Sequence, residues 1–257
     1  MEKIFNQITK NNLKLYYFIS DVHLGLLDRH LDRKREDLLL RVLDKIKEDA
    51  KVIYLVGDIF DYWFEYKEVI PSFFYRTLNK IYELTQAGIE IKYLMGNHDF
   101  GHRSFFFDEF GIEIIKEDIE INLFDKRIFI SHGDGKSKKD LGYKILKAIL
   151  RHPISNKLFN ILHPDFGIGL AKSSSKKSRH HTDSKDYGET DGMRQFAFDK
   201  IDEGYDYVVM GHRHKAEKTK HNNGYYINLG EWLNNPTFAS FDGDDFKIIY
   251  VNEFLVN

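Results

Sequence analysis

The sequence predicts an α/β domain in which two β-sheets pack together and the helices lie outside them. Over the first hundred residues, short apolar runs rich in β-branched and aromatic residues alternate with helical segments, and such runs are typical of strands covered on both faces. Residues 224–251 instead show short strands separated by turns, and Asp242-Gly243 between 237–241 and 246–251 predicts a β-hairpin. Together these patterns favour two sheets over a single doubly wound sheet.

Each strand and helix of the first part follows from a local pattern. Strands are expected where apolar residues run almost without interruption, at 13–20, 52–56, 89–95, 127–131 and 207–210. A helix is expected over 33–47, because its apolar residues fall on one helical stripe. A second helix is expected over 73–84, with Gly88 as the signal that ends it.

Residues 135–197 depart from this pattern and are expected to form a helical, basic insertion within one domain that spans residues 1–257. The segment opens with three lysines, continues with amphipathic stretches at 141–150 and 154–162, and then becomes rich in Gly, Ser and Lys. It falls between two strands that both end in candidate site residues, which favours an insertion over a second domain. Apolar residues flanked by Lys and Arg suit contact with an anionic membrane surface. The alternative is a helical hairpin packed on the core with a solvated basic face.

Composition sets wide limits on function. Hydrophobic residues make up 42% of the chain and charged residues 30%, which is ordinary for a globular protein. The formal net charge of −2 gives no general attraction to polyanions, so nucleic acid is not expected as a partner. The absence of cysteine excludes disulfides, thiolate metal ligands and a Cys nucleophile. We expect a cytoplasmic protein, because the N-terminus has no apolar signal segment and no run approaches the roughly 20 apolar residues that cross a bilayer.

Polar residues follow five of the expected strands in succession. In chain order these strand ends carry Asp21-x-His23, Gly57-Asp58, Gly96-Asn97-His98-Asp99, His132-Gly133-Asp134 and Gly211-His212-x-His214. In open α/β sheets, ligands bind outside the carboxyl ends of the strands. We therefore expect these side chains to meet at one site.

Two local features would help the side chains to converge. Residues two apart point the same way if the chain stays extended, which would apply to Asp21 and His23 and again to His212 and His214. The glycines beside the polar residues would let the backbone turn and approach a ligand closely; they are Gly57, Gly96, Gly133 and Gly211.

Each motif alone also has an ordinary explanation. An Asp-x-His is most often a polar turn, a Gly-Asn-His-Asp is often a turn with a helix cap, and neighbouring histidines can simply be solvated. Five such motifs in order, each after an apolar strand, instead favour metal binding. Carboxylate, amide oxygen and imidazole suit Mn²⁺, Fe²⁺ or Zn²⁺ better than Ca²⁺ or Mg²⁺. The predicted ligands are Asp21, His23, Asp58, Asn97, His132, His212 and His214.

The ordered motifs D-x-H, G-D-x-x-D, G-N-H-D, H-G-D and G-H-x-H, between about residues 19 and 231, resemble those of the calcineurin-like metallophosphoesterase superfamily. The resemblance implies a four-layer α/β/β/α sandwich of two mixed sheets and the hydrolysis of a phosphate ester or anhydride. It also implies two divalent metal ions, with Mn²⁺ expected and Fe²⁺ or Zn²⁺ as alternatives. One ion would bind Asp21, His23, Asp58 and His214, and the other Asp58, Asn97, His132 and His212, so that Asp58 bridges them.

The resemblance also implies a catalytic role for the histidine of G-N-H-D. His98 would contact the phosphoryl oxygen or protonate the leaving group, and Asp99 would orient its ring. The alternative for His98 is a structural histidine beside the site.

Within the superfamily the chain resembles the UDP-2,3-diacylglucosamine pyrophosphatases of lipid A synthesis. The residues that carry this likeness are Ser20-Asp21-Val22-His23-Leu24-Gly25, Gly57-Asp58-Ile59-Phe60-Asp61-Tyr62-Trp63, Gly96-Asn97-His98-Asp99-Phe100, and His132-Gly133-Asp134 followed by Asp140-x-x-Tyr143. Those enzymes split the diphosphate into a lipid monophosphate and UMP, and their helical insertion holds the acyl chains. One departure is His98, where that branch usually carries arginine.

The resemblance implies a lipid-linked nucleotide as substrate, cleaved at the cytoplasmic face of the inner membrane. Asp140 and Tyr143 would contact it, with a helix cap and a packed aromatic residue as the alternative for this pair. Lys172, Lys176 and Lys177 are candidates for holding the lipid phosphate, although their stretch does not copy the pattern of that branch. Two other functions stay open: a phosphoesterase for a soluble nucleotide or another phosphodiester, and a metal-binding scaffold without catalysis.

Overall fold

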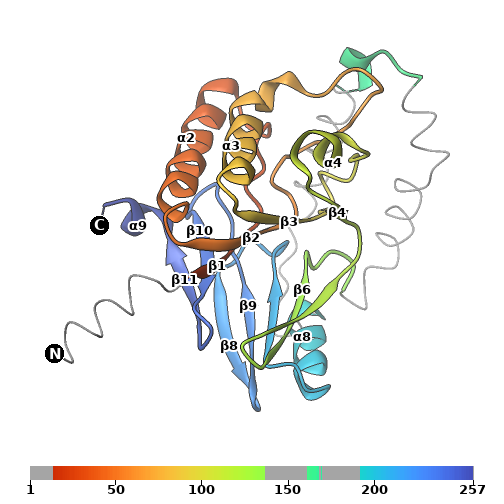
Figure 1. Cartoon of the computed structure of the whole chain (residues 1–257). Helices are drawn as coiled ribbons and strands as arrows, with labels where there is room; N and C mark the ends of the chain where they lie inside the picture. Colours follow the sequence, from red (N-terminus) through yellow and green to blue (C-terminus); the bar gives the residue numbers. More distant parts are fainter. Residues whose placement is uncertain (1–13, 137–160, 168, 170–191, 257) are drawn as a thin grey trace.

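A computed structural model describes residues 14–136, 161–167, 169 and 192–256, and their helices and strands form four layers (Figure 1). The first sheet has the order β11-β10-β1-β2-β3-β4 and contains β1 (Leu15–Ile19), β2 (Ala50–Val56), β3 (Glu90–Leu94), β4 (Ile114–Ile115), β10 (Thr237–Phe241) and β11 (Phe246–Tyr250). The second has the order β5-β6-β7-β9-β8 and contains β5 (Ile119–Leu123), β6 (Lys126–Ser131), β7 (Tyr207–Met210), β8 (Glu217–His221) and β9 (Gly224–Asn228).

Both sheets are mixed. Strands β1 to β4 run parallel to one another, and β10 pairs antiparallel with both β1 and β11. In the second sheet β6, β7 and β9 are parallel, whereas β5 and β8 are antiparallel edge strands. The central strands of each sheet therefore end on one side, which places the loops that follow them together.

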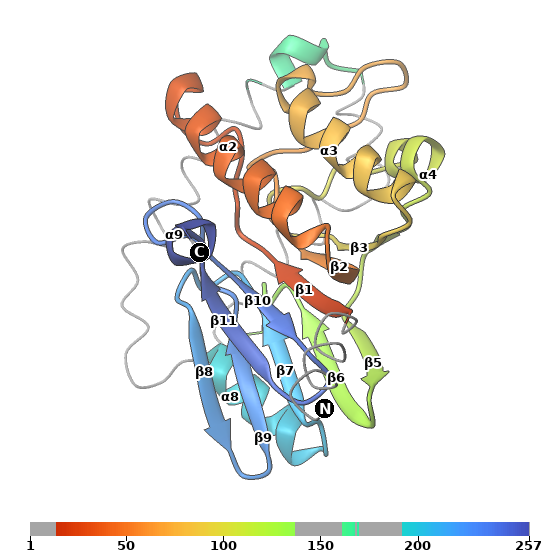
Figure 2. The same cartoon turned by 60° about the vertical axis from the view of Figure 1, so that its left-hand side comes forward.

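Helices cover the outer face of each sheet (Figure 2). Over the first sheet lie α2 (Arg29–Ile46), α3 (Tyr75–Gln86), which follows a 3₁₀ turn η1 (Ser72–Phe74), and α4 (Phe105–Phe110), with α9 (Val251–Val256) at the C-terminal end. The second sheet is covered by α8 (Gly192–Asp202), which buries Met193, Ala197 and Ile201 against it. The expected four-layer α/β/β/α sandwich is thus confirmed.

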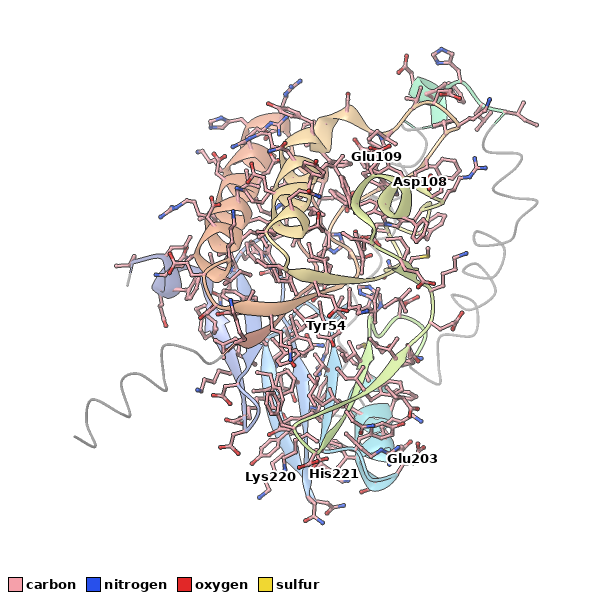
Figure 3. The ribbon with its side chains drawn as sticks, viewed as in Figure 1. Tyr54, Asp108, Glu109, Glu203, Lys220 and His221 are labelled. Carbon is pink, nitrogen blue, oxygen red and sulfur yellow. The ribbon has the colours of Figure 1, made fainter. Side chains whose placement is uncertain are left out.

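The middle of the sandwich is apolar and is built by strict alternation along the strands. In β1, Tyr17 and Ile19 face the helices, whereas Tyr16 and Phe18 face the second sheet. Phe18 stacks on Tyr54 with ring centroids 4.8 Å apart, and Figure 3 shows Tyr54 between the two sheets. Because the sheets pack through such side chains, the positions of their strand ends are fixed relative to one another.

The local predictions are largely confirmed, with shifted boundaries. Helix α2 begins at Arg29 and not at 33, because the Asp28 side chain accepts hydrogen bonds from two backbone N–H groups of the first turn. The expected β10–β11 hairpin is present, and its loop is four residues long. The Asp242 carboxylate accepts the N–H groups of Asp244 and Asp245 in that loop, and Gly243 adopts a positive φ of 100°.

The proposed insertion lies mostly outside the described residues, so its helical character stays a prediction. Helix α8 runs through Ala197, the residue at which the insertion was expected to end, and the helix belongs to the outer layer of the second sheet. Within the described ranges, no helix combines the length and the apolar character that a bilayer crossing needs.

Candidate metal centre

Loops from both sheets meet at the carboxyl ends of β1, β2, β3, β6 and β7. Backbone hydrogen bonds join them: the N–H of His23 donates to the carbonyl of Asp58 (2.9 Å), and that of Asp21 to Gly57 (3.2 Å). Across the second sheet, Gly211 N–H donates to the carbonyl of His132 (3.1 Å). The sandwich therefore brings the five predicted motifs to one place.

Five of the seven predicted ligands have a left-handed backbone. The φ angles of Asp21, His23, Asp58, His212 and His214 lie between 50° and 65°. The Asp21-x-His23 and His212-x-His214 segments are therefore not extended, and their side chains converge because the backbone turns. Left-handed residues other than glycine cost about 1–3 kcal/mol each and are concentrated at functional sites.

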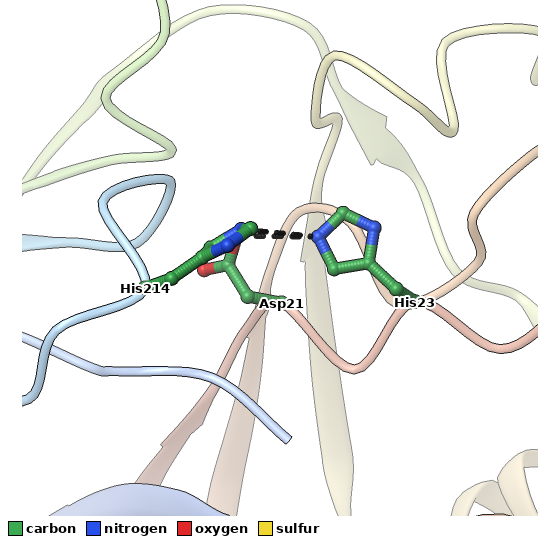
Figure 4. A group of neighbouring side chains, drawn as sticks. All are labelled: Asp21, His23 and His214. Atoms are coloured by element: carbon green, nitrogen blue, oxygen red, sulfur yellow. Dashed lines mark hydrogen bonds and ion pairs between the residues drawn. The ribbon is translucent and has the colours of Figure 1, made fainter. Parts of the chain in front are cut away.

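A first cluster joins the loop after β1 to the loop after β7 (Figure 4). Asp21 Oδ1 lies 3.2 Å from His214 Nε2 and 3.7 Å from His23 Nε2, and the two Nε2 atoms are 3.3 Å apart. All three residues offer one ligand atom within 4.8 Å of the others. Their spacing suits a shared cation.

A second cluster contains the remaining predicted ligands. His132 Nε2 lies 2.9 Å from Asn97 Oδ1 and 3.2 Å from Asp58 Oδ2. The ring of His212 packs edge-on against that of His132 at 5.3 Å, and Asp58, His132 and His212 offer ligand atoms within 4.8 Å of one another.

Asp58 connects the two clusters. Its Oδ2 atom lies 3.7 Å from His23 Nε2 in the first cluster and 3.2 Å from His132 Nε2 in the second. The side chain is almost completely buried. Asp58 thus lies between the two clusters, and its role as a bridging ligand stays a prediction.

The atoms that converge here are electron-pair donors. His132 Nδ1 lies 2.9 Å from the carbonyl oxygen of Val56, which can only accept, so Nδ1 carries the proton. In the neutral ring, Nε2 then offers a lone pair, and it faces the oxygens of Asn97 and Asp58. The lone pairs of these atoms repel one another unless a cation, either a proton or a metal ion, lies between them.

The same arrangement is repeated around His23. Its Nδ1 lies 3.2 Å from Asp61 Oδ1, so the ring donates to Asp61 and offers the Nε2 lone pair to the first cluster. The carboxylates are oriented by backbone N–H groups: His212 donates to Asp21 Oδ2 (2.9 Å) and His98 to Asp58 Oδ1 (2.8 Å). Asp21 Oδ1 is buried and has no hydrogen-bond partner among the described residues. The donor set thus fits two divalent cations.

In the absence of cations, protons on the imidazoles would balance part of the charge of the buried carboxylates. Burial alone would raise the pKa of Asp58, but the imidazoles of His132 and His98 hold it well below its usual range. Burial opposes the charging of His132, yet the Asp58 carboxylate raises the pKa of this imidazole to about 10. Burial and the neighbouring His132 lower the pKa of His212 to about 4. For Asp21, the imidazoles of His214 and His23 outweigh burial and keep the pKa well below its usual range.

His98 lies beside the first cluster. Its ring packs edge-on against that of His23 at 4.9 Å, and its Nδ1 lies 3.3 Å from the carbonyl oxygen of Asp61 and 3.6 Å from Asp61 Oδ1. The side chain is one-tenth exposed. This position fits a residue that reaches a ligand next to the cations.

Asp99 does not orient the ring of His98, and that expectation is wrong. Its carboxylate accepts hydrogen bonds from the Gly96 N–H (2.8 Å), the Ile59 N–H (3.0 Å) and the Tyr93 hydroxyl (2.7 Å). Asp99 therefore ties the loop after β3 to the loop after β2, and it is Asp61 that faces the ring of His98.

Two supporting residues were not singled out from the sequence. Asp61 was visible as the second aspartate of G-D-x-x-D, but only the structure shows it between His23 and His98. These three could also gather around a cation; we assign Asp61 a supporting role because it faces His23 Nδ1, and not the Nε2 that faces Asp21 and Asp58. Asn228 had no sequence signal; its buried amide donates to the Gly211 carbonyl (2.8 Å).

Two of the predicted glycines are needed for close approach. A Cβ atom on Gly96 would lie 2.1 Å from Asp58 Oδ1 and 2.4 Å from the Asp58 backbone nitrogen. One on Gly211 would lie 2.4 Å from Asp21 Oδ2. Each glycine thus leaves room for a carboxylate of the site.

The predicted substrate contacts lie outside the described residues. They are Asp140, Tyr143, Lys172, Lys176 and Lys177. Their roles stay predictions.

Comparison with known proteins agrees with this geometry. The model of the calcineurin-like phosphoesterase family matches residues 15–216, so the chain belongs to that family. The fold, the site and the match together define a metallophosphoesterase, a hydrolase with Asp and His clusters that suit a binuclear metal site.

Several relatives share a more specific name. A protein of Porphyromonas gingivalis named UDP-2,3-diacylglucosamine hydrolase is 31% identical over 245 residues, which cover 88% of this chain and 94% of that protein. A protein of Neisseria meningitidis with the same name is 28% identical, with 90% of this chain and 96% of that protein covered. A solved archaeal phosphodiesterase is similar at a TM-score of 0.47 and 16% identity, over 92% of this chain and 99% of that one.

Replacing Gly96 by alanine tests the close packing of the site. The new methyl group would displace Asp58, so we expect Gly96→Ala to lose roughly 100-fold or more in phosphoesterase activity with Mn²⁺ while the protein stays folded by circular dichroism.

Gly88→Ala is the matched control. A Cβ atom there meets nothing within 4 Å, but φ is 79°, so the variant should lose about 1 kcal/mol of stability and no activity. Full activity in Gly96→Ala would show that the loop does not need this glycine.

Proposed function

We propose that this protein hydrolyses UDP-2,3-diacylglucosamine to 2,3-diacylglucosamine 1-phosphate and UMP, at the cytoplasmic face of the inner membrane. The observation that carries the reaction is the convergence of two ligand clusters on Asp58. The choice of substrate is supported by relatives named UDP-2,3-diacylglucosamine hydrolase, which align over most of this chain.

The clusters would hold two metal ions, for which we propose Mn²⁺. Asp21, His23 and His214 would bind one ion, Asn97, His132 and His212 the other, and Asp58 both. Such a pair lowers the pKa of a bound water and neutralises charge on phosphoryl oxygens. Asp61 and the Val56 carbonyl keep His23 and His132 in the tautomer that presents Nε2 to the site.

His98 is proposed to act on the substrate directly. With Nδ1 held by the carbonyl oxygen of Asp61, the ring can present Nε2 to a phosphoryl oxygen or to the leaving group. The Asp61 carboxylate also faces this ring, with its Oδ1 3.6 Å from Nδ1.

The described piece of the proposed insertion supports an acylated substrate. Ile161 and Phe166 are 78% and 71% exposed, and only Val256 exceeds them among the large apolar side chains of the described residues. Apolar side chains that are open to solvent suit contact with acyl chains or with the membrane that carries them.

Product analysis tests the proposed reaction. With Mn²⁺, the purified protein should release UMP from UDP-2,3-diacylglucosamine in detergent micelles, as measured by chromatography of the nucleotide. Removal of metal with EDTA should abolish release, and added Mn²⁺ should restore it. Asp58→Ala should lose at least about 1000-fold, because both clusters lose a ligand.

A soluble diester provides the comparison. Cleavage of bis(p-nitrophenyl) phosphate without UMP release would keep the metal chemistry and exclude the lipid substrate. Activity in Asp58→Ala equal to that of the unaltered protein would exclude the bridging role.

Replacing His98 tests its role in catalysis. His98→Gln should keep both metal ions and lose about 100-fold to 10,000-fold in kcat, the range for loss of a general acid. His98→Arg should also lose activity if the imidazole donates a proton, whereas near-full activity would show that a positive charge is sufficient at this position. Metal content of both variants, measured by mass spectrometry, separates a catalytic loss from a loss of metal.

A further inference from the structure

Helix α2 reaches the candidate metal centre through the backbone of His23. The guanidinium Nη2 of Arg35 donates a 2.7 Å hydrogen bond to the carbonyl oxygen of His23. The same nitrogen pairs with the carboxylate of Asp32, which lies one turn earlier on the helix. Arg35 is 4% exposed and Asp32 is 1% exposed, so the pair is buried beside a proposed metal ligand.

The pair also acts on the loop that follows His23. Burial raises the pKa of the Asp32 carboxyl, and the guanidinium of Arg35 and the backbone groups of Leu27 and Gly25 oppose that rise. Arg35 thus holds the start of this loop, at the carbonyl oxygen of His23.

His23 needs such support because its backbone is left-handed, with φ at 50°. Its N–H is held by the Asp58 carbonyl (2.9 Å) and its ring by Asp61 (3.2 Å). Its carbonyl oxygen accepts from Arg35 and, more weakly, from the Leu26 N–H at 3.3 Å. Arg35 is thus the side chain that fixes the direction of the peptide group after His23, and with it the direction in which Nε2 points.

Stability alone is a poor explanation for this arrangement. The loss of hydration on burying two charges offsets most or all of their attraction, so a buried ion pair is weak evidence for a gain in stability. A left-handed residue other than glycine adds backbone strain. A positioning role explains better than stability why the buried Arg35–Asp32 pair is joined to His23, a proposed ligand with a strained backbone.

We propose that Asp32 and Arg35 are positioning residues that keep His23 Nε2 directed at Asp21 and His214, and so set the affinity of the first cluster for its metal ion. This inference rests on the proposed function, because it takes His23 as a metal ligand. The pair acts on the backbone of His23, and its effect is specific to the first of the two ions.

Metal binding, measured apart from activity, tests this proposal. Metal-free full-length protein is titrated with Mn²⁺ by calorimetry, and the bound ions are examined by electron paramagnetic resonance. In Arg35→Met, one ion should bind about 10-fold to 100-fold more weakly and the other unchanged, the range for loss of a residue that orients a ligand. The signal of a coupled Mn²⁺ pair should give way to that of an isolated ion, and Arg35→Lys should recover part of the affinity.

A second variant and a matched control keep the test decisive. Asp32→Asn combined with Arg35→Met leaves no unpaired buried charge and should show the same selective loss. Arg33→Met is the control, because Arg33 also pairs three residues along, with Glu36, and donates to a carbonyl, that of Phe73 at 3.2 Å. The Arg33→Met variant should bind both ions with the affinity of the unaltered protein.

The outcomes separate the two claims. Unchanged binding of both ions in Arg35→Met and in the double variant overturns the positioning role and leaves the metal centre intact. Equal weakening of both ions, or the same loss in Arg33→Met, also overturns it, because the effect would then be general. If the unaltered protein binds no Mn²⁺, the proposed metal centre fails and the inference fails with it.

Discussion

The site depends on one constraint. Several atoms that offer lone pairs are buried around Asp58, and in their neutral imidazole and carboxylate forms they have too few hydrogens to form hydrogen bonds with one another. His132 Nδ1 donates to the Val56 carbonyl, so its Nε2 meets the oxygens of Asn97 and Asp58 as one acceptor among others. His23, which donates to Asp61, is placed in the same way. A protein gains nothing in stability from such a group by itself. Two divalent cations would turn this repulsion into binding energy, and the ligand clusters suit such a binuclear site.

The rest of the architecture serves this arrangement. The parallel central strands of two sheets end together, and the apolar layer between the sheets holds those ends in register. Left-handed backbone turns then direct five of the candidate ligands inward, and two glycines leave room for the carboxylates. Backbone N–H groups occupy one oxygen each of Asp21 and Asp58, so the other oxygen of each is directed at the clusters. Strain and burial are therefore concentrated at the loops, while the sheets and helices supply the stability.

The sequence predicted most of what depends on local pattern. Apolar runs, the α2 stripe and the Asp-Gly turn predicted the layers and the hairpin, and the order of motifs predicted the ligands that the structure brings together. It failed where the outcome depends on tertiary contacts. The left-handed backbone at Asp21 and His23 could not be predicted, because backbone strain leaves no sequence signal. Asp99 was assigned to the His98 ring on adjacency alone, although its carboxylate holds the Gly96 loop. The edge strand β8 was not predicted, because its polar sequence EKTKH lacks the apolar pattern of the buried strands.

In the proposed metal centre, two metal ions share Asp58. Anomalous diffraction from crystals grown with Mn²⁺, recorded on both sides of the manganese absorption edge, tests it most directly. We expect two peaks about 3.5–4 Å apart, one among Asp21, His23 and His214 and one among Asn97, His132 and His212, with the Asp58 carboxylate between them. A single peak, or peaks that leave Asp58 without a metal neighbour, would contradict it.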